Sequence, residues 1–166
     1  SGYKVEFLTP NTGTDDYTGH PSPMPALGGA SAQPLRFLDF LIHQSVRAVI
    51  LHGAGIPVRV PAPERFAVHK LIVASRRLTD DDGTAKSRKD RQQAVTLMIA
   101  MIELRQRETL VDAYMEAWER GPAWREAIQA SMKMLDADVE RRLRDELSAG
   151  VTALEGRPSE YGLRDT

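Results

Sequence analysis

The sequence predicts an α+β fold in which short strands come first and a helical bundle follows. Two observations predict it: β-branched and alternating runs end at Val60, and apolar residues at helical spacing follow from Glu64 onward. With 166 residues, 42% of them hydrophobic, the chain can bury a core. We therefore expect a sheet domain over residues 1–62, containing a partial mixed or antiparallel sheet, and a helical bundle domain over residues 63–166.

Charge and cysteine content narrow the functional classes. The 22 basic and 23 acidic residues give a net charge of -1, so no global field favours nucleic acid or an anionic membrane. The chain has no cysteine, which excludes disulfides, thiolate zinc sites and a cysteine nucleophile. No apolar run approaches the roughly 20 residues of a membrane helix, and no export signal is visible. We expect a cytoplasmic protein without a membrane partner.

The first element expected is a strand over Tyr3 to Leu8, in which apolar and charged residues alternate until Thr9-Pro10 ends it. Residues 11–33 are rich in Gly, Pro, Ser, Thr and Asp, which predicts a long loop. Leu35 to Ile42 is apolar at nearly every second or third position, and so short a run fits a strand or a helix equally well.

A hairpin should follow, because two β-branched runs flank a glycine turn. Val46 to Leu51 and Ile56 to Val60 are separated by His52-Gly53-Ala54-Gly55, which supplies the turn. This segment lacks the spacing of a dinucleotide-binding loop and the Gly-Lys-Ser/Thr of a P-loop. Prolines at positions 61 and 63 then stop the sheet.

Helices account for the remainder of the chain. The first should begin just after Pro63 and end before the polar insert Thr79 to Thr84. A second should run from about Ser87 to Arg105, and two or three more should follow within Leu110 to Arg120 and Trp124 to about Leu147. The buried stripe of the second helix is expected to be Ala94, Leu97, Met98, Met101 and Ile102.

One face of the first helix is cationic. Lys70, Ala74 and Arg77 lie on the same face, because seven residues make almost two helical turns. The small Ala74 would leave room for a phosphate-sized group between the two cations. Lys86 and Lys89 would open the next helix, where a positive charge opposes the helix dipole unless an anion is near. The alternative is that these cations are solvated surface residues.

The order of motifs around this face resembles a known family. Val58 to Arg77 contains a strand, a proline and a helix with Lys-Leu-x-x-Ala-x-x-Arg, and after an insert Lys86 to Asp90 ends in Lys-Asp. This order resembles the polymerase-β-like minimal nucleotidyltransferases of bacteria, which include relatives of abortive-infection toxins. Similar segments are Val5 to Pro10, Ala32 to Asp39 and Trp118 to Trp124. The resemblance implies that this chain corresponds to the C-terminal part of such a protein.

The resemblance also implies a site. In this family three carboxylates hold two Mg²⁺ ions, which clamp a nucleoside triphosphate for in-line transfer of a nucleotide. Val5-Glu6-Phe7 matches the third carboxylate, so Glu6 would be a catalytic metal ligand. The Gly-Ser and Asp-x-Asp elements that carry the other two are expected upstream, in an N-terminal segment of the same protein. This chain alone is therefore expected to be inactive.

The remaining roles implied by the resemblance lie on the cationic helix and the helix after it. Lys70 would meet the triphosphate, Arg76 or Arg77 with Lys89 would support it, and Asp90 would hold Lys70 or Arg77 in place. The acceptor could be RNA, a protein or a small molecule. Two rivals stay open: a non-catalytic protein-interaction module or degenerate nucleotide-binding domain, and nucleic-acid binding through Lys86 to Arg91.

Other conspicuous residues are better explained by structure. The histidines, His20, His43, His52 and His69, lack the spacing of metal ligands, and Asp80 to Gly83 is typical of a solvated loop. Trp118 and Trp124 bracket a helix end and restart, which favours packing between helices over base stacking. The arginines after residue 140 alternate with acids, as on a solvated helical face: Arg141, Arg142 and Arg144.

Overall fold

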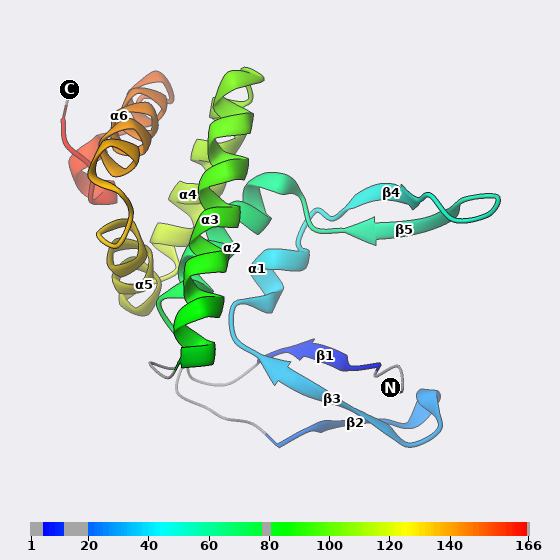
Figure 1. The fold of residues 1–166 in the computed structure, drawn as a ribbon. Helices are drawn as coiled ribbons and strands as arrows, with labels where there is room; N and C mark the ends of the chain where they lie inside the picture. Colours follow the sequence, from blue (N-terminus) through cyan, green and yellow to red (C-terminus); the bar gives the residue numbers. More distant parts are fainter. Residues whose placement is uncertain (1–4, 12–19, 78–80, 166) are drawn as a thin grey trace. The chain divides into compact units, whose positions relative to one another are not determined.

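The computed structural model describes residues 5–11, 20–77 and 81–165, and the chain divides into two compact units, Ser1–Val60 and Pro61–Thr166. Short strands lie in the first unit and a helical bundle makes up the second, so the predicted α+β class is confirmed (Figure 1). Whether each unit folds as a domain by itself stays a prediction. No helix of the described residues is long and apolar enough to cross a membrane.

A three-stranded sheet opens the first unit. Its strands are β1 (Phe7–Pro10), β2 (Ser22–Met24) and β3 (Ala30–Leu35). The central strand β3 is parallel to β1 and antiparallel to β2, so the sheet is mixed. Of the strand predicted over Tyr3 to Leu8, the first two residues lie outside the described part of the chain. Pairing with β3 begins at Phe7 and continues through Pro10, so the strand does not end at Thr9-Pro10 as predicted.

The long loop predicted over residues 11–33 is wrong for its second half. β2, the 3-10 turn η1 (Pro25–Leu27) and most of β3 lie there, while residues 12–19 lie outside the described part of the chain. Gly28 and Gly29 take positive φ values of 66° and 87°, which the tight connection from η1 to β3 requires. The composition is that of a turn between two short strands, which a count of Gly and Pro does not distinguish from a loop.

The ambiguous run from Leu35 to Ile42 contains both kinds of structure. β3 ends at Leu35, and helix α1 (Leu38–Ile42) follows. Phe37 marks the change with a left-handed φ of 64°. Phe37, Leu38 and Phe40 are buried, and Phe40 has no solvent exposure.

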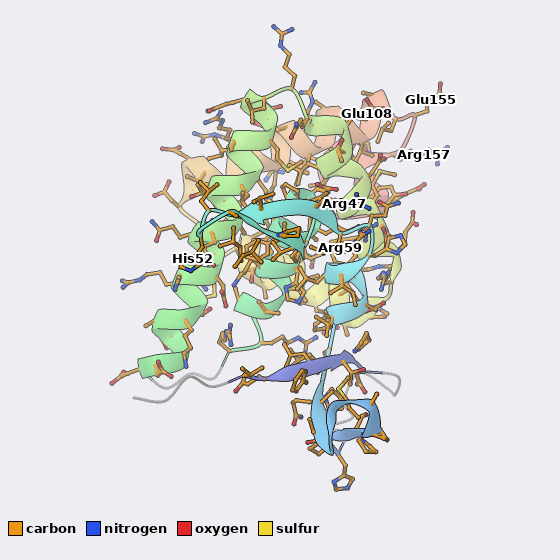
Figure 2. All side chains as sticks on the ribbon, turned by 90° about the vertical axis from the view of Figure 1, so that its right-hand side faces the viewer. Arg47, His52, Arg59, Glu108, Glu155 and Arg157 are labelled. Atoms are coloured by element: carbon orange, nitrogen blue, oxygen red, sulfur yellow. The ribbon has the colours of Figure 1, made fainter. Side chains whose placement is uncertain are left out.

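The hairpin is confirmed where the sequence predicted it. β4 (Val46–Ile50) pairs antiparallel with β5 (Ile56–Val60), and the turn uses positive φ values at Gly53 and Gly55. It forms a sheet of its own, so the expected single sheet over Tyr3 to Val60 is two separate sheets. Arg47 and Arg59, labelled in Figure 2, face each other across the hairpin, and Arg59 donates to the Ser45 carbonyl.

Most of the exposed large hydrophobic side chains of the described residues lie in the first unit. Among the described residues, only Leu104 and Met134 are exposed large hydrophobics outside this unit. Inside it, the exposed residues come from both sheets and from α1: Val5, Phe7, Leu8, Leu35, Ile42, Val46, Val49, Ile50, Leu51, Ile56 and Val60. Extended exposed apolar surface of this kind marks places where proteins contact other chains or segments.

The second unit is built around its first helix. Its elements are α2 (Pro63–Ala74), α3 (Asp81–Glu103), α4 (Arg107–Glu119), α5 (Pro122–Met132), α6 (Ala137–Ala153) and the 3-10 turn η2 (Pro158–Tyr161). Helix α2 contacts α3, α4 and α5, and α3 is the long green helix of Figure 1. Pro63 occupies the first turn of α2, where its missing N–H costs nothing. The core of this unit therefore surrounds α2.

Two helix boundaries differ from the prediction. Helix α3 begins at Asp81 instead of Ser87, because Asp81 and Asp82 suit a helix N-terminus and Asp82 pairs with Lys86 one turn later. The segment from Trp124 to Leu147 is two helices, since the Asp136 side chain accepts from the Asp138 N–H and starts α6.

The buried stripe of α3 is also offset from the predicted one. Ala94, Met98 and Met101 are buried as expected, whereas Leu97 and Ile102 are only half-buried. The stripe continues toward the N-terminus through residues that carry no large apolar group, which is why sequence periodicity missed them: Gly83, Ser87 and Asp90.

The two tryptophans pack inside the bundle, as predicted. Each is only 6% exposed, and the Trp118 indole N–H donates to the Glu160 carbonyl at 2.8 Å. The Arg120 guanidinium lies 5.1 Å from the Trp124 ring centre. Neither ring is free to stack on a base. The arginines of α6 pair with acids: Arg141 with Asp138, Arg142 with Glu103, and Arg144 with Glu140. The predicted solvated face holds for Arg141 and Arg142, which are exposed, whereas Arg144 is half-buried.

Candidate functional site

Three of the predicted site residues meet in one ion cluster between α2 and α3. The Lys70 ammonium donates to Asp90 Oδ1 at 2.7 Å, and the Arg77 guanidinium donates to Asp90 Oδ2 from Nε at 2.9 Å. Asp90 thus holds both cations, where the sequence predicted one or the other. The exposed fraction of the side chain rises from 5% at Asp90 to 19% at Lys70 and 40% at Arg77. The carboxylate therefore lies beneath the two cations, which face outward.

The local packing of α3 on α2 produces this geometry. The Ser87 hydroxyl donates to the Ala74 carbonyl at 2.6 Å, and this fixes α3 against the C-terminal turn of α2. Ala74 is only 2% exposed, so the expected room for a phosphate beside it does not exist. The small side chain serves instead to let α3 approach. The anion that lies between Lys70 and Arg77 is the Asp90 carboxylate itself.

The cluster keeps a surplus of positive charge. Burial would raise the pKa of Asp90, but hydrogen bonds from Lys70 and Arg77 outweigh it and hold that pKa below its usual value. With Asp90 ionised, two cations face one anion. An anionic ligand could therefore bind at the outer side of Lys70 and Arg77 without displacing Asp90.

Lys70 has a second contact that the sequence analysis overlooked. Its ammonium lies 5.1 Å from the centre of the Phe66 ring, in the geometry of a cation–π interaction. Phe66 precedes Lys70 by one helical turn, so the i, i+4 spacing could have indicated this pair. Phe66 and Asp90 together fix the position of the ammonium group.

His69 is a second overlooked neighbour of the cluster. Burial, together with the charge of Lys70, lowers its pKa to about 4, so the ring is neutral at pH 7. Its buried Nδ1 has no hydrogen-bond partner within the described chain. No pattern in the sequence indicates this histidine, because its burial depends on helices that are distant along the chain.

The other predicted site residues are not members of this cluster. Arg76 donates from Nη2 to the Ala123 carbonyl at 2.9 Å, which ties α2 to the start of α5. Lys89 is exposed on α3, and within the described ranges it makes no hydrogen bond or ion pair. Lys86 pairs with Asp82 within α3, so it does not open that helix as expected. Glu6 is exposed in the first unit, directly before β1 and not within a strand.

The described residues do not by themselves form a metal site. Across 5–11, 20–77 and 81–165, no three His, Asp or Glu side chains lie close enough together to hold a metal ion. A two-Mg²⁺ clamp needs several carboxylates at one place. Glu6 alone cannot supply it, and no chemical step through a metal is assigned to these residues.

The sequence of this chain matches a family model, described as a nucleotidyltransferase, over residues 1–119. Because the match covers more than half of the chain, the protein belongs to this nucleotidyltransferase family. The match includes both sheets, the ion cluster and all of α4, and it ends at Glu119, the last residue of that helix. Comparisons with curated proteins and with solved structures gave no match.

Proposed function

We propose that the cluster of Lys70, Asp90 and Arg77 binds the triphosphate of a nucleoside triphosphate, and that the protein transfers the nucleotide to an acceptor. The observation that carries this proposal is the buried carboxylate beneath two outward-facing cations. Membership of a nucleotidyltransferase family, with the cluster inside the matched range, supports it.

Two cations on one carboxylate leave this cluster with a net positive charge. A single buried carboxylate is neutralised by one cation, and the second one adds cost by placing like charges near each other. That cost is offset when an anion with several oxygens binds at the outer side, as a triphosphate would. Lys70 has further N–H donors beyond the one on Asp90, and Arg77 presents a planar fork suited to phosphate oxygens.

The metal chemistry of the family would need residues beyond this cluster. We infer that Glu6 is one Mg²⁺ ligand and that other carboxylates come from a further segment of the same protein. The exposed apolar surface of the first unit supports this inference, since such a segment would cover it. Glu6→Ala should therefore have no effect on binding of a triphosphate without metal.

A titration with matched variants tests the proposal. ATP would be titrated calorimetrically against the parent chain, Lys70→Ala and Lys133→Ala, the last an exposed lysine at the end of α5. Loss of one charge-assisted contact should weaken binding by about 1.5 to 3 kcal/mol, roughly tenfold or more. Added salt should weaken binding further, because the cluster is partly exposed.

The control separates a specific site from general charge. Lys133→Ala removes the same charge and should leave ATP binding within about twofold of the parent, because Lys133 makes none of the hydrogen bonds or ion pairs of the cluster. Equal affinity of the parent and Lys70→Ala would contradict the proposal. The rival protein-interaction module would then account better for the exposed apolar residues of the first unit.

A further inference from the structure

A pocket of about 370 Å³ lies between α2 and α3, beside the ion cluster. All of its lining belongs to the second unit, with one residue from α2 and the others from α3: Phe66, Lys89, Gln92, Gln93, Thr96 and Leu97. Among the six, only Lys89 is a predicted site residue. The pocket has no role in the function proposed so far.

The pocket is continuous with the cluster on both helices. On α2, Phe66 lines the pocket and its ring centre lies 5.1 Å from the Lys70 ammonium. On α3, Gln93 lies three residues after Asp90 and therefore on the same side of the helix. A ligand whose phosphates bind the cluster could place its other end in this pocket.

The chemistry of the lining suits a flat ring with polar edges. Phe66 and Leu97 offer apolar surface for the faces of such a ring, and aromatic side chains stack well on nucleobases. Gln92, Gln93 and Thr96 offer donors and acceptors for its edge. No carboxylate lines the pocket, and Lys89 is the one charged residue of its lining.

The Gln93 side chain has a buried acceptor that points to a ligand at this pocket. Its Oε1 atom is buried and has no hydrogen-bond donor within the described chain. A buried acceptor without a donor is unfavourable, and a ligand N–H would satisfy it. Every common nucleobase carries an N–H group or an amino group on its edge, and glutamine pairs with such edges through its amide.

We propose that this pocket is the nucleobase subsite for the nucleotide whose triphosphate binds Lys70 and Arg77. The inference rests on the function proposed above and adds to it. Phe66 stacks on the base, and the Gln93 amide accepts a hydrogen bond from the base edge. Gln93 is then a residue that binds the base, while Lys70 and Arg77 bind the triphosphate.

The experiment compares four nucleoside triphosphates with a triphosphate that lacks the nucleoside. ATP, GTP, CTP and UTP, and inorganic tripolyphosphate, would each be titrated calorimetrically against the parent chain and its variants. The parent should bind at least one nucleotide more tightly than tripolyphosphate. Gln93→Ala should weaken the affinity for that nucleotide roughly three- to tenfold and leave the affinity for tripolyphosphate unchanged.

Two further variants keep the result interpretable. Thr96→Phe fills the pocket from an exposed position of α3 without removing a contact of the cluster. It should weaken the binding of nucleotides and leave the binding of tripolyphosphate unchanged. Gln129→Ala, which shortens a half-buried glutamine of α5, should change neither affinity. Thermal melting of each variant shows that the chain is folded.

The possible failures are distinct. Equal affinity of the parent for tripolyphosphate and all four nucleotides would overturn the base subsite, as would a Gln93→Ala variant that binds them as the parent does. If Lys70→Ala leaves tripolyphosphate binding unchanged, the proposed triphosphate site is wrong. A Gln93→Ala variant that weakens the binding of nucleotides alone would then support only the base subsite. Absence of any binding at millimolar concentration would overturn both proposals.

Discussion

Gly150 of α6 lies directly against Val111 of α4, and the space between them is too small for a methyl group. An alanine in the middle of a helix is normally more favourable than a glycine by about 1 kcal/mol. Here the added carbon would collide with the Val111 side chain, so Gly150→Ala should destabilise the second unit by about 1 to 3 kcal/mol.

Urea unfolding monitored by tryptophan fluorescence checks this expectation. Both tryptophans of the chain, Trp118 and Trp124, lie in the second unit, so the signal reports on that unit alone. In a Val111→Ala background the collision is relieved, and the cost of Gly150→Ala should shrink or change sign. Equal costs in both backgrounds would show that another contact is responsible.

Met98 and Leu97 are adjacent on α3 but should respond differently to truncation. Met98 has no solvent exposure, whereas Leu97 is half-buried at the edge of the pocket. Met98→Ala should cost about 2 to 5 kcal/mol, because it leaves a cavity in the core. Leu97→Ala should cost about 1 kcal/mol, since solvent already reaches that side chain. A larger effect at Leu97 would mean that another segment covers the pocket.

Removing the charge of Asp90 should destabilise the bundle. Asp90→Asn leaves Lys70 and Arg77 side by side without their counterion, at an expected cost of about 1 to 3 kcal/mol. The cost is below that of a fully buried pair, because Arg77 is 40% exposed and solvent screens it. Urea unfolding at pH 7 measures it. Asp145→Asn, on the exposed face of α6, serves as the control and should be neutral.

Acid should destabilise the second unit through His69 before it affects the carboxylates. The pKa of His69 is about 4 in the folded chain and 6.5 in the unfolded chain. As pH falls from 6.5 to 4, the unfolded chain takes up a proton that the folded chain does not, so stability falls by about 3 kcal/mol. Burial opposes the effect, but hydrogen bonds from Lys70 and Arg77 lower the pKa of Asp90, and those from Arg65 and Arg120 lower the pKa of Glu116. The stability linked to these two carboxylates therefore begins to fall only as the pH drops below their ordinary pKa values of 3.8 and 4.5.

A variant isolates this contribution. The unfolding free energy of His69→Gln should depend less on pH between 6.5 and 4 than that of the parent. His52→Gln, at the exposed tip of the hairpin (Figure 2), should follow the parent curve. A parent stability that is constant over this range would contradict the low pKa of His69.

The elements that depend on local patterns could be predicted from the sequence. The hairpin of β4 and β5 follows from two β-branched runs and a glycine turn, and the start of α2 follows from Pro63. The pairing of Asp90 with Lys70 or Arg77 was also predicted, though from a family resemblance and not from spacing. Local signals were sufficient wherever the partners lie within one short segment.

The features that depend on distant segments could not be predicted in this way. The sheet of β1, β2 and β3 joins strands separated by a Gly- and Pro-rich stretch, so its pairing leaves no periodic signal. The burial of Ala74 and His69 is decided by how α3 and other helices pack onto α2. The triphosphate role of Lys70 and the metal role of Glu6 stay predictions that the experiments above test.

Helix α5 lies beyond the region of family similarity, yet it holds the helix that carries Lys70. The Ser131 hydroxyl donates to the Leu71 carbonyl at 2.5 Å, and Arg76 donates to the Ala123 carbonyl. Ser131 and Ile128 have no solvent exposure, so cutting the chain after Glu119 would expose the face of α2 that α5 covers. The region that matches the family model, residues 1–119, therefore ends inside the second unit, which continues to Thr166. A family member that shares only residues 1–119 therefore has to cover this face of α2 with a different C-terminal segment.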